Sequence, residues 1–115
     1  MLATPEGALI LVQENNNMNP SSMIDFMLKE LTKEEVEYGY KYKETTISRE
    51  IGKYRVKGKQ AITTYKDSNW VREVCAAEGK DCGILIITQI ETVSNAKEQF
   101  LIDNFWKTLE IKELH

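Results

Sequence analysis

Histidine is almost absent from this 115-residue chain, because its one histidine, His115, is the last residue. A Ser/His/Asp or Cys/His catalytic arrangement needs an imidazole that is held in place and titrates near neutral pH, and chain ends fray. Glycine-rich phosphate loops of the G-x-G-x-x-G or Walker type are also missing from the sequence. We therefore expect a protein that is not an enzyme and that carries no cofactor.

Long hydrophobic runs are missing as well. The longest are Ala8 to Val12 and Ile84 to Ile87, far short of the roughly 20 residues that span a bilayer. The first residues contain neither the basic region nor the apolar region of a secretory signal. We expect no membrane span and a single domain over residues 1–115. Because an apolar strand begins almost at the N-terminus, we also expect that a preceding hairpin or signal segment has been lost.

Cysteine is scarce, with only Cys75 and Cys82, seven positions apart. In an oxidising compartment they could form a disulfide, and in a reducing one they would be two small buried apolar residues. Two cysteines fall well below the density of a disulfide scaffold, and their spacing does not fit a zinc site. We therefore expect no metal, and both interpretations of the cysteine pair stay open.

The stretch from Cys82 to Glu91 predicts the centre of the fold. Its residues Ile84, Ile86 and Ile90 point to one face at the two-residue period of a strand, and Leu85 and Ile87 point to the other. Neither face can be left in water without exposing branched aliphatic surface. Such a strand lies inside a sheet that is covered on both faces, here by helices.

Two segments have the spacing of amphipathic helices. The first begins at Asn19 and Pro20, an N-cap followed by proline at the first helical position, and is expected to end between residues 33 and 37. The second begins at the capping box of Asn95 and Glu98. Their apolar faces are formed by Ile24, Met27, Leu28 and Leu31 in the first helix and by Ile102, Phe105, Trp106 and Leu109 in the second.

The remaining segments are predicted to be strands. Residues 7–12 predict an interior strand, and residues 38–65 predict a long hairpin in which Gly58 is typical of a bulge. Residues 70–77 fit both a helix and a strand, and we favour a strand that leads directly into residues 82–91. The expected fold class is α+β, with a central, mostly antiparallel sheet and helices packed on both faces, as an α/β/α sandwich.

This order of elements resembles that of the PsbP-like family, whose fold is shared with a Ran-binding nuclear import factor of yeast. The resemblance rests on five segments: residues 7–12, the helix after Asn19, residues 54–65, residues 83–90 and the ending 105–111. It departs from the family in lacking the opening hairpin. The resemblance implies a non-enzymatic accessory or binding domain of a kind that is often exported, which favours a periplasmic or secreted location. It transfers no site residue.

Charge is distributed unevenly along the chain. Residues 38–66 carry eight lysines or arginines against two glutamates, a net charge of +6 in a chain whose total is −3. Together with its tyrosines, this hairpin is a candidate surface for an unknown protein partner. The candidate binding residues are Tyr40, Tyr42, Lys43, Lys53, Tyr54, Arg55, Lys57 and Lys59.

Three alternatives accompany that hypothesis. The same hairpin could bind single-stranded nucleic acid or an anionic surface, although the acidic total argues against nucleic acid. A small enzyme could use the carboxylates Glu34, Glu35 and Glu37, although nothing apolar surrounds them in the sequence and a solvated helix end explains them better. The simplest explanation, which we favour, is that the lysines solubilise the hairpin and protect its edge, an edge through which copies of the chain could also associate.

Overall fold

The computed structural model describes residues 2–3, 9–16, 19–52, 54–66, 68–78, 82–91 and 96–109. The described residues form six strands and two helices. The strands are β1 (Leu2–Ala3), β2 (Leu9–Asn16), β3 (Lys41–Ile51), β4 (Tyr54–Tyr65), β5 (Ser68–Glu78) and β6 (Cys82–Glu91). The helices are α1 (Pro20–Tyr38) and α2 (Ala96–Thr108). Neither helix is long and apolar enough to cross a membrane.

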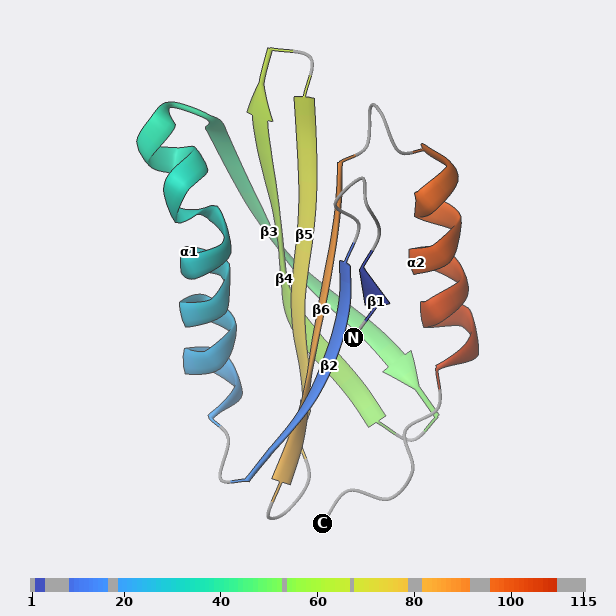
Figure 1. The fold of residues 1–115 in the computed structure, drawn as a ribbon. Coiled ribbons are helices and arrows are strands. Elements are labelled where there is room, and N and C mark those ends of the chain that lie inside the picture. The colour runs from blue at the N-terminus through green and yellow to red at the C-terminus, as the bar shows by residue number, and fades with distance from the viewer. Residues whose placement is uncertain are drawn as a thin grey trace.

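The strands form one sheet in the order β1-β2-β6-β5-β4-β3, and every neighbouring pair is antiparallel (Figure 1). The predicted α+β class with an antiparallel sheet is confirmed. The strand predicted at residues 7–12 is β2, which pairs with β6 along its whole length, while residues 7 and 8 lie outside the described part. Leu2 and Ala3 pair with Ile10 and Leu9, so a short antiparallel pair precedes the rest of the sheet.

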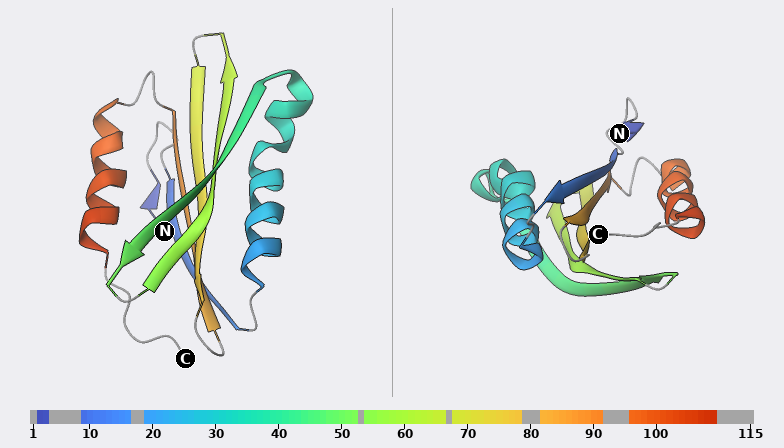
Figure 2. Two further views of the ribbon diagram at one scale, coloured as in Figure 1. Left: turned by 180° about the vertical axis from the view of Figure 1, so that it is seen from behind. Right: turned by 90° about the horizontal axis from the view of Figure 1, so that it is seen from below.

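Strand β6 lies inside the sheet and is buried on both faces, as its sequence predicts. Leu85 and Ile87 pack in a cluster with Ile24 and Leu28 of α1. The alternate residue Ile86 packs in a second cluster, against which Phe105 and Trp106 of α2 are placed. A third cluster joins Ile90 to Ile102 of α2. The two views of Figure 2 show α1 and α2 on opposite sides of the curved sheet.

Helix α1 begins as predicted, because the Asn19 side chain accepts a hydrogen bond of 3.2 Å from the backbone N–H of Ser22 and Pro20 is the first helical residue. The predicted end between residues 33 and 37 is wrong. The helix continues to Tyr38 and closes at Gly39, whose φ of 117° lies in the left-handed region. Tyr38 is therefore helical, and β3 begins only at Lys41.

Helix α2 occupies the segment predicted for the second helix. Its apolar face carries Ile102, which is buried, and Phe105 and Trp106, whose rings meet edge to face with centroids 5.4 Å apart. The capping residue Asn95 lies outside the described residues.

The predicted hairpin is formed by β3 and β4, but Gly58 is not a bulge. The pairing runs without interruption from Lys41↔Thr64 to Ile51↔Tyr54, and Gly58 faces Ile47 on one side and Cys75 on the other. A Cβ at this position would lie 2.0 Å from the backbone oxygen of Val74. Glycine is required here because β4 and β5 approach closely.

The ambiguous segment at residues 70–77 belongs to β5, so the preferred strand interpretation is confirmed. Its register argues against the disulfide. Cys75 is a free, buried thiol opposite Ile86, and Cys82 lies four residues further along β6. Four strand residues cover about 13 Å, whereas the Cα atoms of a disulfide lie within about 7 Å. The interpretation of Cys75 as a small core residue holds instead.

Candidate functional site

The hairpin register distributes the predicted binding residues over both faces of the sheet. Ala61 of β4 packs with Leu28 of α1, and its partner in β3 is Glu44. Because side chains alternate along a strand, this pair assigns each residue of β3 and β4 to one of the two sheet faces. We call these faces the α1 face and the α2 face, after the helix nearer to each. The α1 face carries Tyr42, Arg55, Lys57 and Lys59, and the α2 face carries Lys43 and Tyr54. Tyr40 precedes β3, and Lys53 lies outside the described residues. The predicted surface is therefore not one continuous patch.

Several of the basic side chains are neutralised by carboxylates. Lys59 Nζ lies 2.8 Å from Asp25 Oδ1 and 3.2 Å from Glu44 Oε1, which ties β4 to both α1 and β3. Arg55 pairs with Glu50 at 2.8 Å. Within the described part of the chain, no such pair is formed by Lys41, Lys43 or Lys57. The positive charge that remains exposed on the hairpin is thus smaller than the sequence total suggests.

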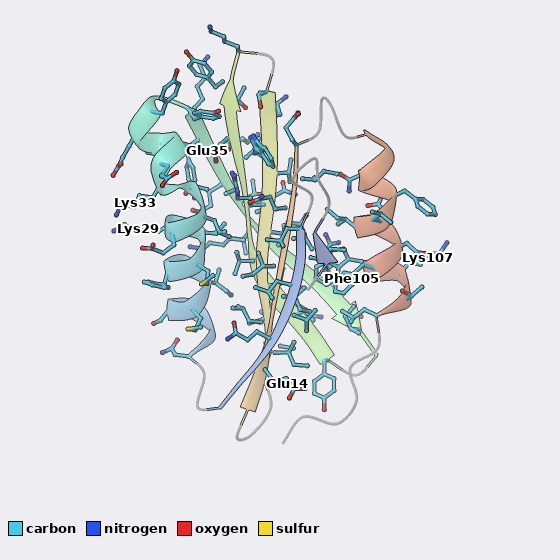
Figure 3. The ribbon with its side chains drawn as sticks, in the orientation of Figure 1. Glu14, Lys29, Lys33, Glu35, Phe105 and Lys107 are labelled. Atoms are coloured by element: carbon cyan, nitrogen blue, oxygen red, sulfur yellow. The ribbon has the colours of Figure 1, made fainter. Side chains whose placement is uncertain are left out.

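The structure adds a groove that the sequence does not reveal. It lies between α1 and the β3–β4 hairpin and encloses about 640 Å³. Leu28 and Thr32 of α1 are buried at the groove, and Val36 lines it with 47% of its surface exposed. Tyr42 lines it from β3. In Figure 3, Lys29 and Lys33 project from the outer side of α1, so they form its rim.

A second hollow of about 270 Å³ continues the groove toward the beginning of α1. It is lined by Ile24 and Thr46, and it shares Asp25 and Lys59 with the larger hollow. The Asp25–Lys59 ion pair therefore lies between the two hollows and links helix to hairpin.

The pKa values of three polar groups in the groove are shifted in directions that keep each group in its usual charge state at neutral pH. Desolvation and a hydrogen bond of 2.6 Å to Glu44 raise the pKa of Tyr42 to about 12. The same hydrogen bond, together with Lys59, lowers the pKa of Glu44. Hydrogen bonds to Asp25 and Glu44 raise the pKa of Lys59. Tyr42 stays neutral, Glu44 stays anionic and Lys59 stays cationic.

The edge of the sheet beside this groove is exposed. Strand β3 has eleven residues and pairs with β4 along its inner side, and no described residue pairs with its outer side. Its residues from Lys41 to Thr46 are all exposed. Such an edge presents a row of backbone N–H and C=O groups that a further strand can bind.

One of the carboxylates considered for catalysis has a different setting from the expected solvated helix end. Glu35 forms an ion pair with Arg72 of β5, which is buried, and accepts a hydrogen bond of 3.0 Å from Thr63. Arg72 also donates to Gln89 at 2.7 Å. Figure 3 shows Glu35 on the side of α1 that faces the sheet. Every member of this network has a partner, so it fixes α1 on the sheet.

The described residues contain no group of three histidine, cysteine or acidic side chains that could hold a metal ion. What the site does offer is an apolar floor, a tyrosine hydroxyl, a set of fixed charges and an adjoining strand edge.

Comparison with known proteins supports the fold alone. No family model matches the chain, and no curated protein matches it. Among solved structures it is similar to PA94 of Pseudomonas aeruginosa, a protein of unknown function described as a candidate regulator. The similarity has a TM-score of 0.58 at 10% sequence identity and covers 97% of this chain and 78% of PA94. At that identity, the likeness concerns the arrangement of helices and strands and transfers no residue.

Proposed function

We propose that this protein is a non-enzymatic binding domain that takes up an extended segment of a partner protein along the outer edge of β3. The observation that carries the proposal is the juxtaposition of the outer edge of β3, whose residues from Lys41 to Thr46 are exposed, with the groove between α1 and the hairpin. Neither feature alone defines a site. Together they offer the two elements that strand addition uses, which are main-chain hydrogen bonds and a hollow for alternate side chains.

The position of α1 supports this mode of binding. The helix packs on β4 and β5, where Ala61 and Val74 meet its apolar face. Strand β3 lies beside the helix and is not covered by it. Tyr42 on its α1 face therefore remains 42% exposed. A strand added outside β3 would direct every second side chain toward this face. Those side chains would enter the space between Tyr42 and Val36.

The electrostatics favour binding over catalysis. A general acid or base works best with a pKa near the working pH, whereas the pKa values of Tyr42, Glu44 and Lys59 are displaced away from neutrality.

Binding to nucleic acid or to an anionic surface is the second candidate function. It is less well supported, since Arg55 and Lys59 already pair with carboxylates.

We also propose that the fold is the α/β/α sandwich of the PsbP-like family. Two observations support this assignment. The elements follow the expected order, and α1 and α2 pack in two separate apolar clusters. An accessory or binding role would agree with it. An exported location stays a prediction, and the free thiol of Cys75 removes the support that a disulfide would have given.

A display library of random extended peptides tests the proposed function. We expect selection to enrich peptides that protect backbone amides of residues 41–46 from hydrogen exchange. Val36→Arg fills the groove and should abolish binding. Phe26→Arg is the matched control, because Phe26 is 59% exposed on the same helix and does not line the groove. Failure to enrich any peptide over the Val36→Arg variant would overturn the proposal.

A further inference from the structure

The two faces of β3 carry different chemistry over the same few residues. Lys41 and Lys43 point to the α2 face, are exposed and have no ion pair with any described residue. Tyr42 and Glu44 point to the α1 face, where Glu44 is already engaged by Lys59 and by the Tyr42 hydroxyl. One face therefore offers unpaired positive charge, and the other offers the groove.

We infer that the segment bound by β3 alternates acidic and apolar side chains. This inference rests on the proposed strand addition and names the chemistry of its partner. Residues that lie directly opposite each other in neighbouring strands share a face, with Cβ atoms about 5 Å apart. Acidic side chains would therefore meet Lys41 and Lys43, and the apolar side chains between them would point into the groove beside Tyr42 and Val36.

Charge complementarity selects this partner over a second copy of the chain. Antiparallel pairing of β3 with another β3, the mode used throughout this sheet, places each face beside the same face of its partner. The α2 face of β3 contributes Lys41, Lys43 and Arg49 and no carboxylate, and its α1 face contributes Glu44 and Glu50 and no cation. Antiparallel self-pairing would bring like charges together along both faces, so in this mode the edge is suited to a complementary strand and not to itself.

The groove explains why the intervening side chains should be apolar. Its floor is formed by Leu28 and its wall by Val36, while the charged Asp25, Glu44 and Lys59 satisfy one another. An added charge deep in the groove would find no unpaired counter-charge among these three groups, and Lys29 and Lys33 lie at the outer rim. An aliphatic side chain would remove the exposed surface of Val36 and Tyr42 from water.

Designed peptides test the inference by fluorescence anisotropy. The probes are dye-labelled peptides of about eight residues in which valine alternates with glutamate, valine alternates with lysine, or valine and glutamate stand in separate blocks. We expect the alternating glutamate peptide to bind best. The double variant Lys41→Glu, Lys43→Glu should weaken its binding about tenfold and should instead favour the lysine peptide. Both lysines are exposed, so circular dichroism should show an unchanged fold.

The outcomes separate this inference from the proposed function. The inference is overturned if the alternating glutamate peptide and the block peptide bind with equal affinity. It is also overturned if the Lys41→Glu, Lys43→Glu variant still prefers the glutamate peptide to the lysine peptide. If the display library enriches peptides of other chemistry that protect β3, strand addition stands without this partner. If no peptide of any kind protects β3, both fail and the lysines serve only to protect the edge.

Discussion

The guanidinium carbon of Arg49 lies 4.4 Å from the centroid of the Trp106 ring, so a cation–π contact joins the far end of β3 to α2. The same side chain forms an ion pair of 2.6 Å with Glu73 of β5. The edge strand is thus anchored at its C-terminal end while residues 41–46 stay exposed. This arrangement holds the proposed acceptor edge in a fixed position beside the groove.

The Arg49–Trp106 contact should be measurable in a double-mutant cycle with Arg49→Met, which removes the cation, and Trp106→Leu. We expect a coupling of about 0.5 to 2 kcal/mol in the free energy of unfolding, measured by urea denaturation. The comparison pair is Lys66 and Tyr65, with a longer separation of 5.4 Å and an exposed lysine, where coupling should be smaller. Additive effects of the Arg49 and Trp106 variants would contradict a direct interaction.

The buried pair of Glu35 and Arg72 should be far more sensitive than an exposed pair. Glu35→Ala leaves a buried guanidinium without its carboxylate, and we expect a loss of about 3 to 5 kcal/mol in unfolding free energy. Glu50→Ala removes the partner of exposed Arg55 and should cost less than about 1 kcal/mol. Equal losses in the two variants would show that the Glu35–Arg72 network does not hold α1 on the sheet.

Gly58 provides a test of the close approach between β4 and β5. A Cβ there meets the backbone of Val74 and Cys75, which cannot rotate away, so Gly58→Ala should cost at least about 2 kcal/mol. Gly52→Asn is the control, because Gly52 has open space around it and asparagine tolerates its left-handed φ of 59°. Thermal unfolding of both variants measures the difference. A Gly58→Ala protein as stable as Gly52→Asn would contradict the strand pairing.

The repeating side-chain patterns predicted much of this fold. Leu85 and Ile87 alternate with Ile86 in a way that only an interior strand explains, and Asn19 with Pro20 marked the first helix start. The end of that helix was missed because Tyr38 and Tyr40 continue the two-residue alternation of β3, while the left-handed conformation of Gly39 depends on three-dimensional context.

The candidate site was less predictable for a physical reason. Moving a strand register by one residue exchanges its two faces. Alternation shows that Tyr42 and Lys43 point in opposite directions, but the sequence could not show which of the two residues faces α1. The groove depends on where α1 lies relative to the sheet. Long-range contacts set that position: the packing of Leu28 with Ala61, and the ion pair of Glu35 with Arg72, which are 37 residues apart. No local pattern contains this information.

Thiol labelling should show Cys75 to be a free and unreactive core residue. Burial raises its pKa to about 12, so the thiolate needed for alkylation is scarce in the folded protein at mildly alkaline pH. In a Cys82→Ser variant we expect no labelling by iodoacetamide until denaturant is added. In the wild-type chain, denaturant without reductant should expose Cys75 to labelling. Labelling that requires a reductant would show that the cysteine is bridged.

Tyr42 should make stability depend on pH in the alkaline range. Its folded pKa of about 12 exceeds the ordinary value of 10.0, so the unfolded chain loses this proton first as pH rises. Its stabilising contribution is complete below about pH 10 and is lost as pH approaches 12. Urea denaturation of wild-type protein and of Tyr42→Phe should therefore show a steeper alkaline loss of stability in the wild type.

The same tyrosine can report occupation of the groove. Because desolvation is the largest cause of the raised pKa of Tyr42, a peptide side chain placed against its ring should move the phenol titration to still higher pH. The difference between ultraviolet titrations of wild-type and Tyr42→Phe protein, with and without the alternating valine–glutamate peptide, isolates this one phenol. A titration that peptide binding leaves unchanged would place the bound side chains elsewhere on β3, away from the groove.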